Sequence, residues 1–196
     1  MNRLSQYFKK HGFATMKELK AVGFQTRDVR ALVDNETIAK IKPGLYKQAD
    51  LDIDDSSLIE VCKAVPKGVI CLVSALEYHE LSTINPNQIH ISIPHSKKSV
   101  PIIYPPTIFY FFRESHYVLG IDEIPTKYGN IKIYNAEKTI CDMFRYRNKL
   151  GEDLALEGLK NYLKRNDAKI NKLWEYAVKC RVKTILHPYI KAMVVE

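Results

Sequence analysis

The sequence lacks both a long apolar run and paired cysteines. None of its 196 residues belongs to a run approaching the roughly 18 to 20 apolar residues of a membrane span. No basic segment followed by an apolar one opens the chain, as a secretory signal would. The four cysteines are scattered without a C-x-x-C pair, which argues against a disulfide framework. These absences predict a soluble protein of the reducing cytoplasm with no membrane partner.

Motifs of catalysis and cofactor binding are also missing. The chain has only eight glycines, none in a phosphate-binding loop, and no G-x-S-x-G segment. His79, His90, His95 and His116 lack the close spacing that pre-organises metal ligands. Ser74 and His79 are residue types found in a hydrolase triad. A helix cap at Ser74 and a helix-surface position for His79 are the better interpretations. We expect no catalytic residues, no metal and no cofactor, and therefore no enzyme.

Positive charge is concentrated at the start of the chain. The net charge is +8, and residues 1–50 hold ten Lys or Arg against five Asp or Glu, whereas residues 51–196 hold twenty against seventeen. A basic face attracts polyanions and speeds encounter with them. Nucleic acid is thus the leading candidate partner, although charge alone leaves open a basic surface that is simply solvated.

Apolar spacing predicts two short helices before residue 23. Leu4 begins an apolar face that a glycine C-cap at Gly12 ends. Thr15 then occupies an N-cap position with Glu18 three residues later, which is the capping-box pattern. The second helix ends at Gly23, which opens a short turn.

A third helix follows in "QTRDVRALVDN", with Thr26 as its expected N-cap and an apolar stripe behind a polar face that carries Arg27 and Arg30. The turn Gly23-Phe24-Gln25 has the length and glycine content of a helix-turn-helix. In that motif the N-terminal residues of the last helix enter the major groove, so the two arginines are expected to contact bases or phosphates.

A basic hairpin completes this region. Residues Ile38 to Lys42 and Leu45 to Lys47 are expected to pair across Pro43-Gly44. Three helices and a hairpin predict a winged helix-turn-helix domain over residues 1–50, whose wing lies against the phosphate backbone. Its use purely as a protein-interaction module stays open. The predicted contacts to double-stranded DNA are Thr15, Lys17, Thr26, Arg27, Arg30, Lys40, Lys42, Gly44 and Lys47.

The acidic stretch "QADLDIDDSS" marks a domain boundary near residue 50. Asp55 or Ser56 is expected to cap a helix that runs to Val65, and Ser74 to cap the helix of "SALEYHEL". The segments "QIHISIP", "TIFYFF", "YVLG" and "IKIY" are β-prone and predict a sheet of about four strands.

Helical periodicity returns after Asn135. Three segments, "AEKTICDMFRYRN", "EDLALEGLKNYLKRN" and "INKLWEYAVKCRV", and a last helix with Pro188 in its first turn predict a C-terminal helical bundle. The expected fold class is α/β, of the α+β kind: an N-terminal winged helix, then a mixed domain over residues 51–196 with a small β-sheet and the bundle.

The chain resembles the AbiEi family of antitoxins in "FATMKELKAVGFQTRDVRALVDNETIAKIKPGLYK", "CLVSALEYHELSTINPNQIHISIP" and "YNAEKTICDMFRYRNKLGEDLALEGLKNYLKR". These antitoxins are transcriptional regulators of bacterial AbiE-type abortive-infection operons, which act in phage defence. The resemblance implies a repressor that binds the operator in its own promoter. It also implies a type IV antitoxin, which opposes a nucleotidyltransferase-like toxin without holding it in a stable complex.

Other charged groups leave alternatives open. Asp142 and Arg145 lie three apart on one helical face, which predicts an ion pair. Arg145 and Arg147 are expected either to fix that helix to the sheet or to extend the DNA footprint, and the exposed pair Lys97-Lys98 is a further candidate for phosphate contact.

Two other functions stay open beside the repressor. A nuclease delivered by the winged helix would need clustered carboxylates for Mg²⁺, and only Asp122-Glu123 with Lys127 approximates this. The other is a regulator, unrelated to toxins, that responds to a small effector or a partner protein.

Overall fold

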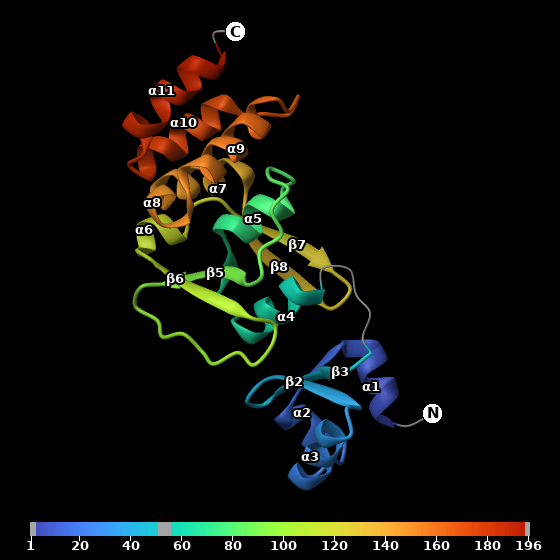
Figure 1. Cartoon of the computed structure of the whole chain (residues 1–196). Helices are drawn as coiled ribbons and strands as arrows, with labels where there is room; N and C mark the ends of the chain where they lie inside the picture. Colours follow the sequence, from blue (N-terminus) through green and yellow to red (C-terminus); the bar gives the residue numbers. More distant parts are fainter. Residues whose placement is uncertain (1–2, 51–55, 195–196) are drawn as a thin grey trace.

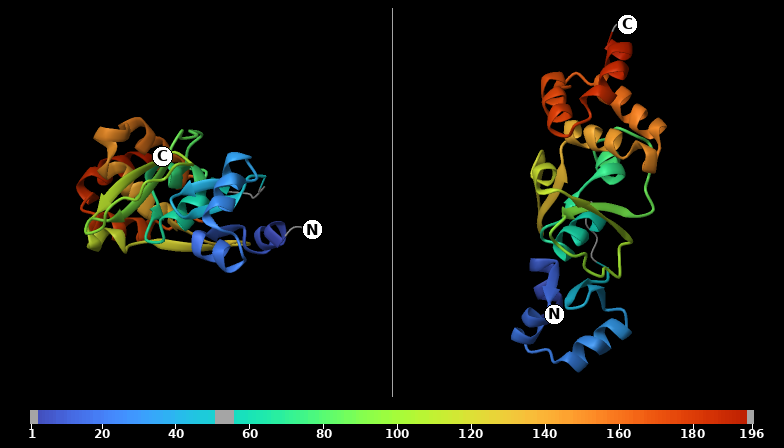
Figure 2. Two further views of the ribbon diagram at one scale, coloured as in Figure 1. Left: turned by 90° about the horizontal axis from the view of Figure 1, so that it is seen from below. Right: turned by 90° about the vertical axis from the view of Figure 1, so that its left-hand side faces the viewer.

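The computed structural model describes residues 3–50 and 56–194 and has an α+β fold, as expected. Figure 1 and the right-hand view of Figure 2 show three parts in a row: an N-terminal unit at one end, a β-sheet in the middle and a group of helices at the other end. Within the described ranges, no helix is long and apolar enough to cross a membrane.

The N-terminal unit consists of three helices and a three-stranded antiparallel sheet. The predicted helices and the hairpin are confirmed, whereas the short strand β1 was not expected. The sheet has the order β1-β3-β2. In chain order the elements are α1 (Arg3–His11), β1 (Phe13–Thr15), α2 (Met16–Ala21), α3 (Thr26–Asp34), β2 (Ile38–Lys42) and β3 (Leu45–Gln48).

Local hydrogen bonds fix the starts of α2 and α3. The capping box of α2 is present: the Glu18 amide donates to Thr15 Oγ1, and the Thr15 amide donates to Glu18 Oε2. The expected cap of α3 is wrong by one residue. Gln25 is the N-cap, its amide donating to Asp28 Oδ2 at 2.8 Å, and Thr26 is already helical.

The middle of the molecule is a five-stranded mixed sheet of order β6-β5-β4-β8-β7. The expected strand at "YVLG" is wrong, because α6 ends at Tyr117 and a turn follows. Two of the five strands were not expected: β4 is only two residues long, and Pro125 and two acidic residues interrupt the apolar pattern of β7. The elements of this part are α4 (Ser56–Ala64), β4 (Val69–Ile70), α5 (Leu72–Tyr78), β5 (Ile89–Pro94), β6 (Thr107–Phe112), α6 (Glu114–Tyr117), β7 (Ile121–Thr126) and β8 (Gly129–Tyr134).

One expected helix cap in this part is wrong, and one alternative for another lies outside the described residues. Helix α5 begins at Leu72, so Ser74 lies inside it, where its hydroxyl accepts a hydrogen bond from the His90 amide at 3.0 Å. Helix α4 begins at Ser56, and Asp55 lies outside the described residues.

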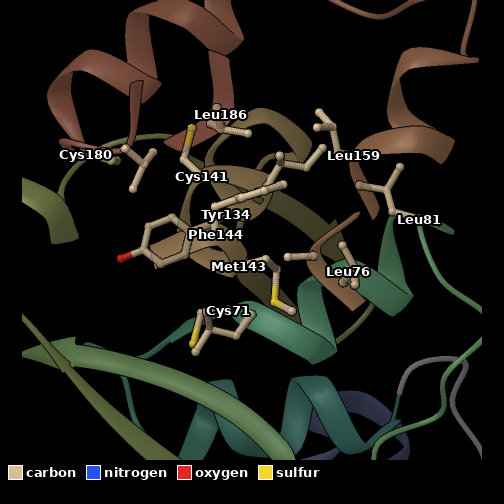
Figure 3. Packing of buried hydrophobic residues seen from close by; sticks show 14 of the residues in the cluster. Cys71, Leu76, Leu81, Tyr134, Cys141, Met143, Phe144, Leu159, Cys180 and Leu186 are labelled. Carbon is tan, nitrogen blue, oxygen red and sulfur yellow. The ribbon is translucent and has the colours of Figure 1, made fainter. Parts of the chain in front are cut away.

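The predicted helical bundle packs on the sheet through a large apolar core. Figure 3 shows Tyr134 of β8 among Leu76, Phe144, Leu159 and other buried side chains of this core. Pro188 lies in the interior of the last helix, not in its first turn as expected. The bundle comprises α7 (Ala136–Arg145), α8 (Arg147–Leu150), α9 (Glu152–Leu163), α10 (Ile170–Lys179) and α11 (Lys183–Val194).

The N-terminal unit shares a core with the middle sheet. Phe13, Ile41 and Leu45 of its strands are buried in one cluster with side chains of α4, such as Ile59. The Ile103 amide, in the loop between β5 and β6, donates to the Ile41 carbonyl at 2.8 Å. One face of the hairpin is therefore covered by the rest of the chain.

Candidate nucleic-acid interface

Helix α3 presents two arginines to solvent. The side chains of Arg27 and Arg30 are 89% and 85% exposed. Each approaches a carboxylate on its own helix: Arg27 Nε lies 3.6 Å from Asp28 Oδ1, and Arg30 Nε lies 3.9 Å from Asp34 Oδ2. Exposed pairs at such distances contribute little to stability. Both guanidinium groups can therefore exchange their carboxylates for a phosphate or a base edge.

The opposite side of α3 holds the helix in place. Val29 is buried in the small core of the N-terminal unit with Leu19 of α2 and Ile38 of β2. Figure 1 shows α3 at the end of the molecule that lies away from the middle sheet. The arginines are thus carried by a packed helix that no other described part of the chain covers.

Three further predicted DNA contacts, Thr15, Lys17 and Gly44, lie around the start of α2. Lys17 is exposed, whereas the Thr15 hydroxyl donates to Glu18 Oε2 at 2.7 Å as part of the cap. Gly44 has φ 80°, a conformation that favours glycine, and its carbonyl accepts from the Met16 amide at 3.0 Å. Thr15 and Gly44 therefore stabilise the unit, and of these three residues only Lys17 keeps its polar group for a partner.

The expected hairpin is confirmed, but two of its three lysines have partners within the chain. Lys42 Nζ donates to the Ala64 carbonyl at the end of α4, at 2.6 Å. Lys47 Nζ lies 2.5 Å from Glu60 Oε1 on α4, and these side chains are only 13% and 1% exposed. Of the three lysines, only Lys40 is exposed to solvent. The hairpin therefore uses two of its charges to bind the second part of the chain.

The pair between Lys47 and Glu60 is nearly closed to water. Burial raises the pKa of Glu60, and the hydrogen bond from Lys47 opposes that rise. Among the described residues Glu60 Oε2 has no hydrogen-bond partner. Because a charge removed from water is costly without a partner, Lys47 is held in this contact.

The secondary basic candidates lie on other parts of the molecule. Lys97 and Lys98 are exposed in the loop after β5. Arg145 donates to His116 Nε2 at 2.9 Å and to the Cys180 carbonyl, and Arg147 donates to the Phe144 carbonyl. Helices α7 and α8 lie at the end of the molecule opposite α3 (Figure 1), so we leave both arginines out of the interface.

The expected ion pair between Asp142 and Arg145 is wrong, and the actual pair was missed. Asp142 Oδ2 accepts from Lys138 Nζ at 2.5 Å, and the two side chains are 1% and 0% exposed. Lys138 Nζ also lies 4.4 Å from the centre of the Tyr134 ring. The only indication of this pair in the sequence was the four-residue spacing of Lys138 and Asp142. Ion pairs on the surface have the same spacing, so it does not indicate burial.

The carboxylates weighed for a nuclease do not converge. Glu123, on the edge strand β7, accepts from the Asn130 side chain at 2.9 Å and lies 3.8 Å from Lys132 Nζ. Lys127 Nζ lies over the Tyr128 ring. Within the part of the chain that the structure describes, no three His, Cys, Asp or Glu side chains are grouped as metal ligands would be.

Ser74 and His79, which were weighed as part of a hydrolase triad, do not bond each other. The Ser74 hydroxyl bonds the His90 amide, while His79 Nε2 lies 2.7 Å from the Tyr134 carbonyl. Because a carbonyl only accepts, His79 Nε2 carries the proton of this contact; burial lowers the pKa of His79, and the hydrogen bond to Tyr134 opposes that shift. Each side chain therefore has a structural partner of its own.

No protein-family model matches the chain, and no curated protein matches it significantly.

Proposed function

We propose that the protein is a sequence-specific DNA-binding repressor of its own promoter, with residues 1–50 as a winged helix-turn-helix domain. The observation that carries the proposal is the exposed pair Arg27 and Arg30 on the packed helix α3. Two helices joined by a glycine-bearing turn, and a hairpin after them, support it.

The geometry supports a division of roles in the complex with double-stranded DNA. Helix α3 enters the major groove, where Arg27 and Arg30 donate to base edges or phosphates. Lys17 on α2 and Lys40 on β2 are exposed and bind the flanking phosphates. Lys42 and Lys47 take no part, because they contact α4.

We further propose that the protein acts in the cytoplasm as an antitoxin that opposes a nucleotidyltransferase-like toxin without a stable complex. This part rests on the resemblance of the quoted segments to the AbiEi family. Residues of "EKTICDMFRYR" from Glu137 to Phe144 are buried in α7. Their role in this proposal is to hold the bundle on the sheet.

The test of DNA binding uses the full chain and a duplex from upstream of its own reading frame. A scrambled duplex of equal length and composition is the control. We expect the native duplex to bind about 10³-fold or more tightly at physiological salt. Equal affinities for the two duplexes would contradict a sequence-specific repressor. Co-expression with a neighbouring nucleotidyltransferase-like gene tests the antitoxin role, because growth must then depend on this chain.

A further inference from the structure

A small cavity lies beyond the carboxyl ends of the parallel strands β5 and β6. Its volume is about 130 Å³, and its walls come from the residue after β5, from the end of β6 and the residue after it, from α6, and from the C-terminal half and cap of α7. Ligands of sheets with parallel strands commonly bind outside the carboxyl ends of those strands. The place in the fold is therefore one where a ligand site is expected.

One side chain that lines this cavity has a buried oxygen without a partner. Asp142 lines the cavity and is 1% exposed. Its Oδ2 accepts from Lys138, but its Oδ1 has no hydrogen-bond partner among the described residues. An unpaired buried carboxylate oxygen is costly and calls for a donor from outside the protein.

Two of the lining side chains are stacked aromatic rings. Phe112 and Tyr146 both line the cavity, and their rings are stacked with centroids 5.9 Å apart and planes inclined by 21°. A cavity of about 150 Å³ accommodates a benzene ring. The volume of about 130 Å³ is slightly smaller than this, so the cavity is closer in size to one six-membered ring than to a fused pair of rings.

The rim is basic. Arg113 is exposed at the mouth, and Arg145 Nη1 donates to His116 Nε2. A guanidinium only donates, so His116 accepts at Nε2 and its ring is neutral. Burial and the nearby Arg145 lower the pKa of His116, in agreement with this. The positive charge of the rim therefore comes from the two arginines, whose donors match a phosphate.

We propose that this cavity binds a pyrimidine nucleoside monophosphate. An N–H group of the base donates to Asp142 Oδ1, the ring lies against Phe112 and Tyr146, and the phosphate accepts hydrogen bonds from Arg113 and Arg145. Cytosine and uracil each offer such a donor on a single six-membered ring. The site is independent of α3 and of the proposed DNA contact.

Calorimetric titration of the full-length protein with CMP, UMP, AMP and inorganic phosphate tests this site. We expect CMP or UMP to bind with a Kd below about 1 mM, and AMP and phosphate alone to bind about tenfold more weakly or not at all. Binding of phosphate as tightly as of CMP and UMP would overturn the proposal, since the base would then contribute nothing. The absence of binding by both CMP and UMP would also overturn it and leave an ordered water as the donor to Asp142.

Two variants locate the ligand. Arg113→Ala removes an exposed side chain and is expected to weaken the binding of the nucleotide about tenfold, while Lys160→Ala, at an exposed position on α9, leaves it unchanged. Asp142→Asn replaces an acceptor by an amide and is expected to abolish binding if the variant folds. If Arg113→Ala bound the nucleotide as the wild type does, the ligand would lie elsewhere and the proposal would fail.

Discussion

Two helices of this protein carry an oppositely charged pair at the same spacing of four residues and place it in opposite surroundings. On α3, Arg30 Nε and Asp34 Oδ2 are 3.9 Å apart, and the side chains are 85% and 70% exposed. On α7, Lys138 Nζ and Asp142 Oδ2 are 2.5 Å apart, and both side chains are almost fully buried. Spacing alone therefore does not reveal what a charged pair does.

The difference decides which charges are available to a partner. An exposed pair is weak, so Arg30 can leave Asp34 for DNA at little cost. A buried pair is different, because removing one member leaves the other charge unpaired and away from water. Lys138 stabilises the fold and is closed to partners, whereas Arg30 adds little to stability and is open to them.

Two lysines of the hairpin differ in exposure in the same way. Lys40 and Lys47 lie on paired strands of the same sheet, and Lys40 is directly opposite Tyr46 in the register. Lys40 faces solvent, whereas Lys47 is 13% exposed beside Glu60. We therefore expect a substitution of Lys40 to weaken DNA binding and a substitution of Lys47 to lower the free energy of unfolding.

The largest expected effect is on α7. Lys138→Met keeps the bulk of the side chain but leaves the Asp142 carboxylate unpaired, so the free energy of unfolding should fall by about 3 to 5 kcal/mol. The pKa of Asp142, already raised by burial, should rise further, because Lys138 opposes that rise. Arg30→Met is the matched control on α3, with an expected loss below about 0.5 kcal/mol. Urea unfolding measures both, and equal losses would remove the distinction between the helices.

The next effect concerns the contact between the hairpin and α4. Lys47→Met leaves Glu60 buried without its partner, with an expected loss of about 2 to 3 kcal/mol. The double variant Lys47→Met, Glu60→Leu should recover most of it, because the stranded charge is then gone. Lys40→Met on the same hairpin should change stability by less than about 0.5 kcal/mol. If Lys47→Met were as harmless as Lys40→Met, the contact would not hold the two parts together.

Stability is also expected to depend on pH through a partly buried histidine, His90. Burial, with a smaller contribution from Lys149, lowers the pKa of His90 to about 4. Between pH 6.5 and about 4 the unfolded chain therefore binds a proton at His90 that the folded chain does not, and stability falls as the pH falls through this window. His90→Gln should reduce the slope of melting temperature against pH. His11→Gln, at an exposed position on α1, is the control, and the same slope in wild type and His90→Gln would contradict the prediction.

The smallest effect is the loss of one phosphate contact. Lys40→Ala should weaken the binding of promoter and scrambled duplexes alike and reduce the salt slope by about one unit. Lys160→Ala on α9 should leave the slope unchanged. Binding isotherms over a salt series measure this, and a loss confined to the promoter would mean that the hairpin contacts bases.

Local signals in the sequence predicted local structure well. Thr15 and Glu18 form the expected capping box, and the Pro43-Gly44 turn joins the expected strands. These features depend on residues within a few positions of one another. The cap of α3 was missed by one residue because glutamine is a rare N-cap and Thr26 beside it is a common one.

Features that depend on distant residues were not predictable in this way. The partners of Lys42 and Lys47 lie on α4, and nothing in the hairpin itself distinguishes these lysines from Lys40. The burial of Lys138 depends on how α7 packs against the rings of Phe112 and Tyr134. The basic face of α3 was predictable from its own period, whereas the cavity at Asp142 combines residues of β6, α6 and α7 that are distant in the sequence.

The affinity of Arg30→Ala for the promoter and for a scrambled duplex, measured at one salt concentration, tests the central claim that α3 contacts the bases. We predict a loss of about 1 to 3 kcal/mol on the promoter and a much smaller loss on the scrambled duplex, because a base contact is lost only where the base is present. The stability of the variant should stay within about 0.5 kcal/mol of the wild type, so the loss reflects binding. Equal weakening on both duplexes, or none on either, would contradict the account.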